Sequence, residues 1–280
     1  MIENNSSSSL DGYAARGNAV AEKRGIITDE DGVERCAICN EPVFELIGGV
    51  KRPVECACDR AEADKSNRRK AVDAARRKAE ASPLFCRMYT GGSFSFAQDD
   101  SASSDASKIC HGYVKHFDEL KQKGYGLFLS GGVGTGKTFY AACIANKLVS
   151  NGVPALMFSS QSLVSAVQSS KSDINELLRE LNSFDLLVLD DFGAERETDF
   201  ALEAIERFTD LRSLSKKPLI VTSNLAPKDM MNACTDLRKM RVCDRLRYMC
   251  PVSVPVLGKS RRAEQQREKE QEALRIMGLV

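Results

Sequence analysis

Eight consecutive residues of this chain have the types and the spacing that bind phosphate groups. They match the pattern G-x-x-x-x-G-K-[ST] and are Gly131, Gly132, Val133, Gly134, Thr135, Gly136, Lys137 and Thr138. Glycines let successive backbone N–H groups point at phosphate oxygens, and the start of a following helix adds partial positive charge. Lys137 would contact the outer phosphates, and Thr138 would place its hydroxyl on Mg²⁺. A glycine turn before a helix is the alternative, but the apolar stretches at 125–130 and 139–148 favour a site for a nucleoside triphosphate.

Two adjacent carboxylates, Asp190 and Asp191, follow an apolar run at 186–189. A buried strand exposes such side chains only at its end, where a parallel sheet places them beside a bound ligand. We expect Asp190 to orient Mg²⁺ and Asp191 to polarise the water that attacks the γ-phosphate. A helix cap or a solvated turn would also use two acids, but the phosphate-binding run upstream favours the catalytic interpretation.

A third polar position, Asn224, follows the apolar run at 219–222. Its amide donates and accepts hydrogen bonds at once, so it could hold the attacking water near the γ-phosphate. The alternative is that Asn224 only begins the turn before Pro227. In combination with the other two motifs, the pattern favours the water-holding role.

Basic residues gather further along the chain. They are Arg238, Lys239, Arg241, Arg245 and Arg247, followed by the pair Arg261 and Arg262. Arg241 and Arg245 are four positions apart, so they share one face of a helix. Guanidinium groups stabilise the charge that develops on a transferred phosphoryl group, because they stay ionised and offer a rigid set of donors. For each single arginine, a solvated surface position is the alternative.

Alternating apolar and amphipathic stretches predict the elements that position these residues. Strands are expected at 126–130, 154–158, 186–189, 219–222 and 252–256, and helices at 137–149, within 161–181, at 200–214 and at 236–248. Strands that alternate with helices imply right-handed crossovers and a mainly parallel sheet with helices on both faces. The predicted fold class is therefore α/β, with the ligand beyond the carboxyl ends of the strands.

Four cysteines near the N-terminus have the spacing of a zinc site and are Cys36, Cys39, Cys56 and Cys58. Four thiolates can close a tetrahedral Zn²⁺ site, and so short a stretch has few other ways to fold. Scattered reduced thiols are the alternative. Catalytic zinc is not expected, because four thiolates leave no open position. The other cysteines are expected to be ordinary residues and are Cys86, Cys110, Cys143, Cys234, Cys243 and Cys250.

Composition limits the class of protein. The chain has 280 residues and carries 40 Lys and Arg against 39 Asp and Glu, which excludes a uniformly basic surface for nucleic acid. The serine-rich start lacks the apolar core of a signal peptide, and no stretch reaches the roughly 18 apolar residues of a membrane helix. We therefore expect a cytoplasmic protein with no membrane partner and with reduced cysteines.

The stretch at 59–81 predicts an exposed basic helix. This helix could bind DNA phosphates or an acidic partner, or it could simply be solvated.

Four motifs together resemble those of the AAA+ ATPases of the DnaC/DnaI helicase-loader group and of their relatives, the IstB-type transposition helpers. The motifs lie at 131–138, 186–193, 220–225 and 241–246, and the last, Arg-x-x-Asp-Arg-Leu, narrows the resemblance most. The resemblance implies that Arg245 acts on ATP bound by a neighbouring subunit, through self-association of the ATPase domain, and that Arg261 or Arg262 contacts nucleotide in its own subunit. It also implies binding to single-stranded DNA and to the hexameric replicative DNA helicase.

We predict five parts in this chain, with limits taken from changes in composition. A mobile arm covers 1–34, a zinc-binding module with a basic helix covers 35–85, a linker covers 86–109, the AAA+ ATPase domain covers 110–262 and a helical tail covers 263–280. The Ser, Asp and Ala content of 93–108 predicts a loop within the linker.

The leading hypothesis is a regulatory, Mg²⁺-dependent ATPase that loads or remodels the replicative helicase, with ATP, Mg²⁺ and Zn²⁺ as cofactors. An ATP-dependent helper of a DNA transposase would use the same core, but the cysteine-bearing N-terminal part resembles the DnaI-like loaders. A small-molecule P-loop kinase would leave Asn224, Arg245 and the cysteines unexplained. A sequence-specific replication initiator is disfavoured, because the stretch after Arg262 is too short for a helix-turn-helix.

Overall fold

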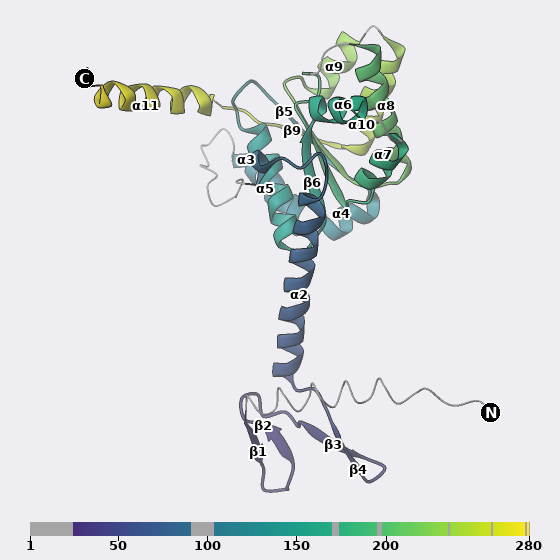
Figure 1. Cartoon of the computed structure of the whole chain (residues 1–280), viewed down its shortest axis with the longest axis vertical. Helices are drawn as coiled ribbons and strands as arrows, with labels where there is room; N and C mark the ends of the chain where they lie inside the picture. The colour runs from purple at the N-terminus through teal and green to yellow at the C-terminus, as the bar shows by residue number, and fades with distance from the viewer. Residues whose placement is uncertain are drawn as a thin grey trace, which may run out of the picture. The chain divides into compact units, whose positions relative to one another are not determined.

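The chain divides into two compact units (Figure 1). The structure is a computed structural model that describes residues 25–90, 104–169, 174–194, 198–234, 236–258, 260–277 and 279. The first unit covers Met1–Lys70 and the second covers Ala71–Val280, so the division falls inside the long helix α2 (Ala57–Glu80). Most of the predicted arm at 1–34 and most of the predicted loop at 93–108 lie outside the described residues. The predicted domain limits stay a prediction.

The N-terminal unit contains two β-hairpins and the first part of α2. Strands β1 (Ile26–Thr28) and β2 (Glu34–Cys36) pair antiparallel, as do β3 (Phe44–Ile47) and β4 (Val50–Pro53). Among its described residues, the buried cluster consists of Cys36, Val43 and Cys56. So small an apolar core cannot offset the entropy that is lost when the chain is ordered, and modules of this size usually need a metal or disulfides.

The second unit is built on a five-stranded parallel sheet with the strand order β6-β7-β8-β5-β9. The strands are β5 (Leu127–Ser130), β6 (Ala155–Ser159), β7 (Leu186–Asp190), β8 (Leu219–Ser223) and β9 (Val252–Pro255). Strands β5, β7 and β8 are buried along their whole length, as continuous apolar runs are in a sheet covered on both faces. The predicted α/β class is confirmed.

Helices cover both faces of this sheet (Figure 1). They are α3 (Ser104–Lys115), α4 (Phe117–Lys123), α5 (Lys137–Ser150), α6 (Ser160–Ser169), α7 (Ile174–Asn182), α8 (Asp199–Leu214), α9 (Pro227–Ala233) and α10 (Leu237–Met249). The last helix, α11 (Arg261–Ile276), contributes no residue that the structure describes to either hydrophobic cluster. One hydrophobic cluster joins α3, α4 and α5 to one face and includes Tyr113 and Tyr140. The other joins α6, α7, α8 and α10 to the opposite face and includes Phe208 and Leu246. Among the described residues, none of the helices combines the length and apolar character that a membrane crossing requires.

Helix α3 begins at Ser104, within the stretch predicted as a loop, so that prediction is wrong for 104–108. Ala106, Cys110 and Tyr113 recur at helical spacing and are almost fully buried. Their packing on α5 outweighs the low helix propensity of the serines and the aspartate around them.

The last turns of α2 belong to the second unit and pack on it. Ala75 and Ala79 are buried, and Lys78 Nζ donates to the carbonyl oxygen of Ser183 at 2.9 Å. The same ammonium lies 4.8 Å from the centre of the Phe184 ring. Elsewhere α2 is largely exposed, as the alanine- and arginine-rich sequence predicts.

Candidate functional site

The phosphate-binding run forms a tight loop between β5 and α5. Gly131, Gly134 and Gly136 have φ angles of 151°, 80° and 104°, which L side chains rarely adopt. A Cβ atom on Gly131 would lie 2.3 Å from the carbonyl oxygen of Val256, and one on Gly134 would lie 2.1 Å from Oγ of Ser260. Glycine is therefore required at both positions. A loop of this shape at the start of a helix suits an anion.

Lys137, the first residue of α5, turns its side chain back onto this loop. Its Nζ donates to the carbonyl oxygens of Gly131 at 3.0 Å and of Gly132 at 2.8 Å. The same Nζ donates to Oδ1 of Asn224 at 2.9 Å, and Lys137 is only 5% exposed. Asn224 directly follows β8, so this contact joins the loop to a second strand end. Thr135 braces the loop, because its Oγ1 donates to the carbonyl oxygen of Gly132 at 3.0 Å.

Asp190, the last residue of β7, is the buried acid of the site, with 2% of its surface exposed. Its Oδ1 accepts from Oγ1 of Thr138 at 3.0 Å and from Oγ1 of Thr222 at 2.6 Å. Burial raises the pKa of Asp190 above its ordinary value, the charge of Asp191 adds to this, and the hydroxyl donors oppose it. Thr138 and Asp190 are thus in contact, and a hydroxyl beside a carboxylate is a suitable pair of ligands for Mg²⁺.

Thr222 is a residue of this site that sequence reasoning missed. Strands β7 and β8 pair in parallel with Leu189 opposite Val221, so Thr222 lies next to Asp190. Its Oγ1 also accepts from the backbone N–H of Asp191 at 2.9 Å. Asp191 has a left-handed φ of 52° and is exposed, whereas Asp190 is buried within the sheet. Threonine is common in strands, and its type alone gave no signal.

Tyr89, in the short helix η1 (Arg87–Tyr89), is a second residue that sequence reasoning missed. It packs against the hydrophobic cluster that includes α5, and its carbonyl oxygen accepts from Nδ2 of Asn146 at 2.8 Å. Burial raises the pKa of its hydroxyl, and the nearby charge of Asp190 raises it further. No motif marks this tyrosine, because only the folded chain brings it to the acid.

The arginines predicted to act on ATP make no contact with the phosphate-binding loop or with Asp190 among the contacts that the structure describes. Arg245, on α10, places Nη1 2.5 Å from Oδ1 of Asp210 and 3.9 Å from Oε1 of Glu206, both on α8. Arg261 and Arg262 begin α11, but their side chains lie outside the part of the chain that the structure describes. The structure therefore brings Lys137, Thr138, Asp190 and Asn224 together and places Arg245 on the α8–α10 side.

In the N-terminal unit, the Sγ atoms of the four candidate zinc ligands all lie within 4.8 Å of one another. They belong to Cys36, Cys39, Cys56 and Cys58. Sulfur ligands of one tetrahedral zinc, at about 2.3 Å from the metal, would lie about 3.8 Å apart. A backbone hydrogen bond at Glu41 lowers the pKa of Cys39 to about 6, whereas burial raises the pKa of Cys56 to about 12. This set of thiols could hold zinc, which favours the thiolate form of every ligand.

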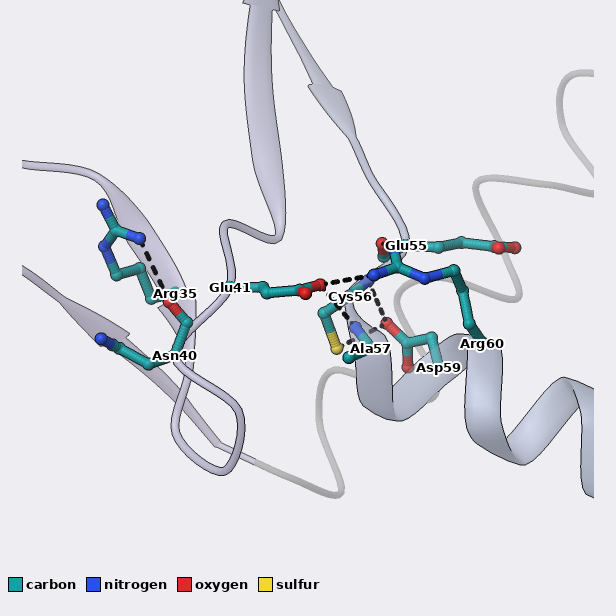
Figure 2. Close-up of polar contacts among 8 residues, drawn as sticks. All are labelled: Arg35, Asn40, Glu41, Glu55, Cys56, Ala57, Asp59 and Arg60. Carbon is teal, nitrogen blue, oxygen red and sulfur yellow. Dashed lines mark hydrogen bonds and ion pairs between the residues drawn. The ribbon is translucent and has the colours of Figure 1, made fainter.

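Polar contacts fix the chain around Cys56 and the start of α2 (Figure 2). Oε2 of Glu41 accepts from the backbone N–H of Ala57 at 2.7 Å and from Nη2 of Arg60 at 2.8 Å. Oδ2 of Asp59 accepts from the backbone N–H of Cys56 at 3.2 Å. Contacts of this kind hold candidate ligands in place, and the helix start favours the negative charge of thiolates.

A parallel sheet with a phosphate-binding loop after β5, a buried acid at the end of β7 and an amide after β8 defines an ATP-binding protein of the AAA+ class. Residues 61–269 match the sequence model of the family described as "IstB-like ATP binding protein", and the chain belongs to that family. The matched residues begin after the four cysteines.

Curated relatives agree with this assignment. The chain is 33% identical over 139 residues to the replicative helicase loader DnaC of Escherichia coli, covering 48% of this chain and 54% of that protein. It is 28% identical over 148 residues to the replicative helicase loader DnaI of Bacillus subtilis, covering 49% of this chain and 47% of that protein. The chain thus spans about half the length of these relatives.

Solved structures share the fold. A crystal structure of DnaI superposes with a TM-score of 0.53 and 26% identity, covering 63% of this chain and 93% of that one. A crystal structure of the DnaC helicase loader gives a TM-score of 0.54 at 20% identity, covering 61% and 100%, and supports the fold alone. The resemblance to the DnaC/DnaI group is confirmed.

Proposed function

We propose that this chain is a regulatory, Mg²⁺-dependent ATPase that binds and loads the replicative DNA helicase. The observation that carries the proposal is the direct contact of the phosphate-binding loop and its helix with two neighbouring strand ends. Lys137 meets Asn224 at 2.9 Å, and Thr138 meets Asp190 at 3.0 Å. Binding of ATP phosphates needs only the loop. Hydrolysis of the γ-phosphate also needs an acid and a group that holds the attacking water beside the loop.

Each residue has a distinct role in the proposed hydrolysis. Backbone N–H groups of 131–138 would bind the phosphates, and Lys137 would exchange its contacts with the loop carbonyls for phosphate oxygens. Bound Mg²⁺, held by Thr138 and Asp190, would supply positive charge next to the phosphates. Asp191 would polarise the attacking water, which Asn224 would orient. The exposed position of Asp191 leaves its carboxylate accessible for that role.

Completion of the site would need a second copy of the chain. Arg245 would act on ATP bound by a neighbouring copy, so the ATPase domain would self-associate. The contacts of Arg245 with α8, and not with the phosphate-binding loop, support an action outside its own site. Arg261 and Arg262 would contact the nucleotide of their own chain.

The N-terminal module would hold one structural Zn²⁺ through its four cysteines and dock on the hexameric helicase. Its apolar side chains Ile38, Leu46 and Val50 are 68%, 74% and 59% exposed, and docking would remove apolar surface of this kind from water. Single-stranded DNA would bind to exposed basic residues of α2 or of the ATPase unit. The names of the curated relatives, both helicase loaders, support this choice of partner.

A pull-down with the host's replicative helicase tests the proposal. The intact chain should retain the helicase in a manner that depends on ATP, and Lys137→Ala should remove the dependence on ATP. Lys147→Ala is a matched control, because Lys147 is an exposed lysine on the same helix. Absence of helicase binding under all nucleotide conditions would exclude the loading role.

A second candidate is an ATP-dependent helper of a DNA transposase. The observation that favours it is the description of the matched family, which is IstB-like. Capture of a DNA transposase by the same ATP-bound chain, without capture of the helicase, would support this function in place of the first.

A further inference from the structure

Arg245 lies against two carboxylates of the neighbouring helix α8. Its Nη1 is 2.5 Å from Oδ1 of Asp210 and 3.9 Å from Oε1 of Glu206. These acids are four residues apart, so they share one face of α8. All three side chains are partly buried, with 32% of Arg245, 39% of Asp210 and 20% of Glu206 exposed. The closer acid, Asp210, is the main partner of the guanidinium.

Both helices are anchored in the core beneath these side chains. Val242 and Leu246 of α10 belong to the same buried cluster as Ile205 and Phe208 of α8. Because Leu246 is buried next to Arg245 in the sequence, the backbone at Arg245 cannot shift without disturbing close packing. The long side chain of Arg245 could still change its rotamer, and the ion pair with Asp210 restricts that motion.

Two other arginines of these helices pair with other acids. Arg207 lies 3.9 Å from Glu203, and Nη2 of Arg238 lies 2.8 Å from Oδ1 of Asp199. Within the described residues, the ion pair formed by Asp210 is the one with Arg245. Asp210 is thus the ion-pair partner of Arg245, the arginine to which the proposed function assigns a catalytic role.

We propose that Asp210 is a positioning residue, which holds the Arg245 guanidinium ready to meet ATP bound by the next copy of the chain. The inference rests on the proposed function of Arg245. An arginine that is ordered in advance loses less side-chain entropy when it meets phosphate. A carboxylate that contacts one nitrogen leaves the other N–H donors of the guanidinium for phosphate oxygens.

Asp210→Asn in the full-length chain tests the inference, because asparagine keeps the size of the side chain and removes its charge. We expect kcat to fall between about tenfold and a hundredfold, as for a slightly misplaced catalytic group, with the Kd for ATP changed by less than about twofold. Asp210→Glu should restore part of the rate. Glu203→Gln is the matched control, since it removes an acid of the same helix that pairs with Arg207. A kcat of Asp210→Asn equal to or above that of the parent chain would overturn the inference.

Mixing of two variants separates positioning from damage to the ATP site. Lys137→Ala keeps Arg245 and Asp210 but lacks the phosphate-binding lysine, whereas Asp210→Asn keeps the complete ATP site. In a mixed assembly, Arg245 of the first variant meets ATP held by the second. The rate of ATP hydrolysis per chain in the mixture should then exceed the mean of the rates of the two variants measured separately. All three rates are measured at a protein concentration above which the rate per chain no longer rises. No gain on mixing would overturn the inference, and a second mixture separates the two causes of that result.

A second mixture tests the proposed function by itself. Arg245→Ala mixed with Lys137→Ala should also gain activity if Arg245 acts on a neighbouring copy. A gain here without a gain in the Asp210→Asn mixture overturns the role of Asp210 alone. No gain in either mixture overturns the action of Arg245 on a neighbouring copy, and with it the inference on Asp210.

Discussion

The two units of this chain differ in what holds their folds. The ATP-binding unit (residues 71–280) packs apolar clusters against both faces of a five-stranded sheet. In the cysteine module (residues 1–70), the buried cluster among the described residues consists of Cys36, Val43 and Cys56. A large apolar core stabilises a fold without any ligand, and a core of three residues does not. We therefore expect the fold of the cysteine module to depend on a bound metal and the fold of the ATP-binding unit to depend on apolar packing.

Removal of zinc should have the largest effect and should be confined to the module. Structural zinc in small domains binds with about 10–16 kcal/mol, and this free energy is also folding free energy. A strong chelator, or Cys36→Ser, should therefore unfold the cysteine module and leave the melting temperature of the ATP-binding unit unchanged. Hydrogen exchange resolved along the chain checks this. Less than one zinc per chain in carefully purified protein would contradict the comparison.

Truncation of a buried side chain should destabilise the ATP-binding unit, whereas truncation of an exposed apolar side chain of the cysteine module should have little effect. Phe158 is fully buried and its ring lies 5.7 Å from that of Phe208, so Phe158→Ala should lower the free energy of unfolding of the ATP-binding unit by about 3–5 kcal/mol. Leu46, on the module, is 74% exposed, and Leu46→Ala should change stability by less than about 0.5 kcal/mol. Urea unfolding of both variants gives the two values. Equal losses would remove the distinction between the units.

Loss of the phosphate-binding lysine should affect ligand binding and leave both folds intact. Lys137→Ala should weaken the binding of ATP about a hundredfold or more, because a buried charge-assisted contact with phosphate is lost. Zinc content and the melting temperature without nucleotide should be close to those of Lys147→Ala. Calorimetric titration with Mg·ATP measures the affinity. Wild-type affinity in Lys137→Ala would remove the lysine from the site.

The last prediction concerns the effect of the buried acid on stability. Asp190→Asn keeps an acceptor for Thr138 and Thr222 but removes a buried charge, so the free energy of unfolding without nucleotide should rise by about 1 kcal/mol at neutral pH, while hydrolysis is lost. Because the pKa of Asp190 is raised in the folded state, its favourable contribution is present at low pH and is lost as pH rises through that pKa. The gain in Asp190→Asn should therefore shrink as the pH is lowered. Denaturant unfolding at several pH values measures this, and a gain that stays constant with pH would contradict it.

Much of the fold follows from local pattern. The short runs at 186–189 and 219–222 are rich in branched apolar residues, and both lie in buried strands of the parallel sheet. The start of α3 was not predictable, because serine and aspartate dominate 101–108 locally and the helix depends on burial of Ala106, Cys110 and Tyr113. The small hairpins of the module were not predicted either, since they lack the apolar alternation that marks a strand.

The residue types and spacings by themselves predicted a phosphate-binding loop, a set of acids and an amide that follow two strands, and a zinc site of four thiols. They did so because phosphate and zinc accept few kinds of ligand at few spacings. Only the tertiary structure decided that Thr222 and Tyr89 accompany Asp190, and that Arg245 lies against Asp210. These partners are ordinary residues from segments far apart in the chain, and the packing of strands and helices alone brings them within reach.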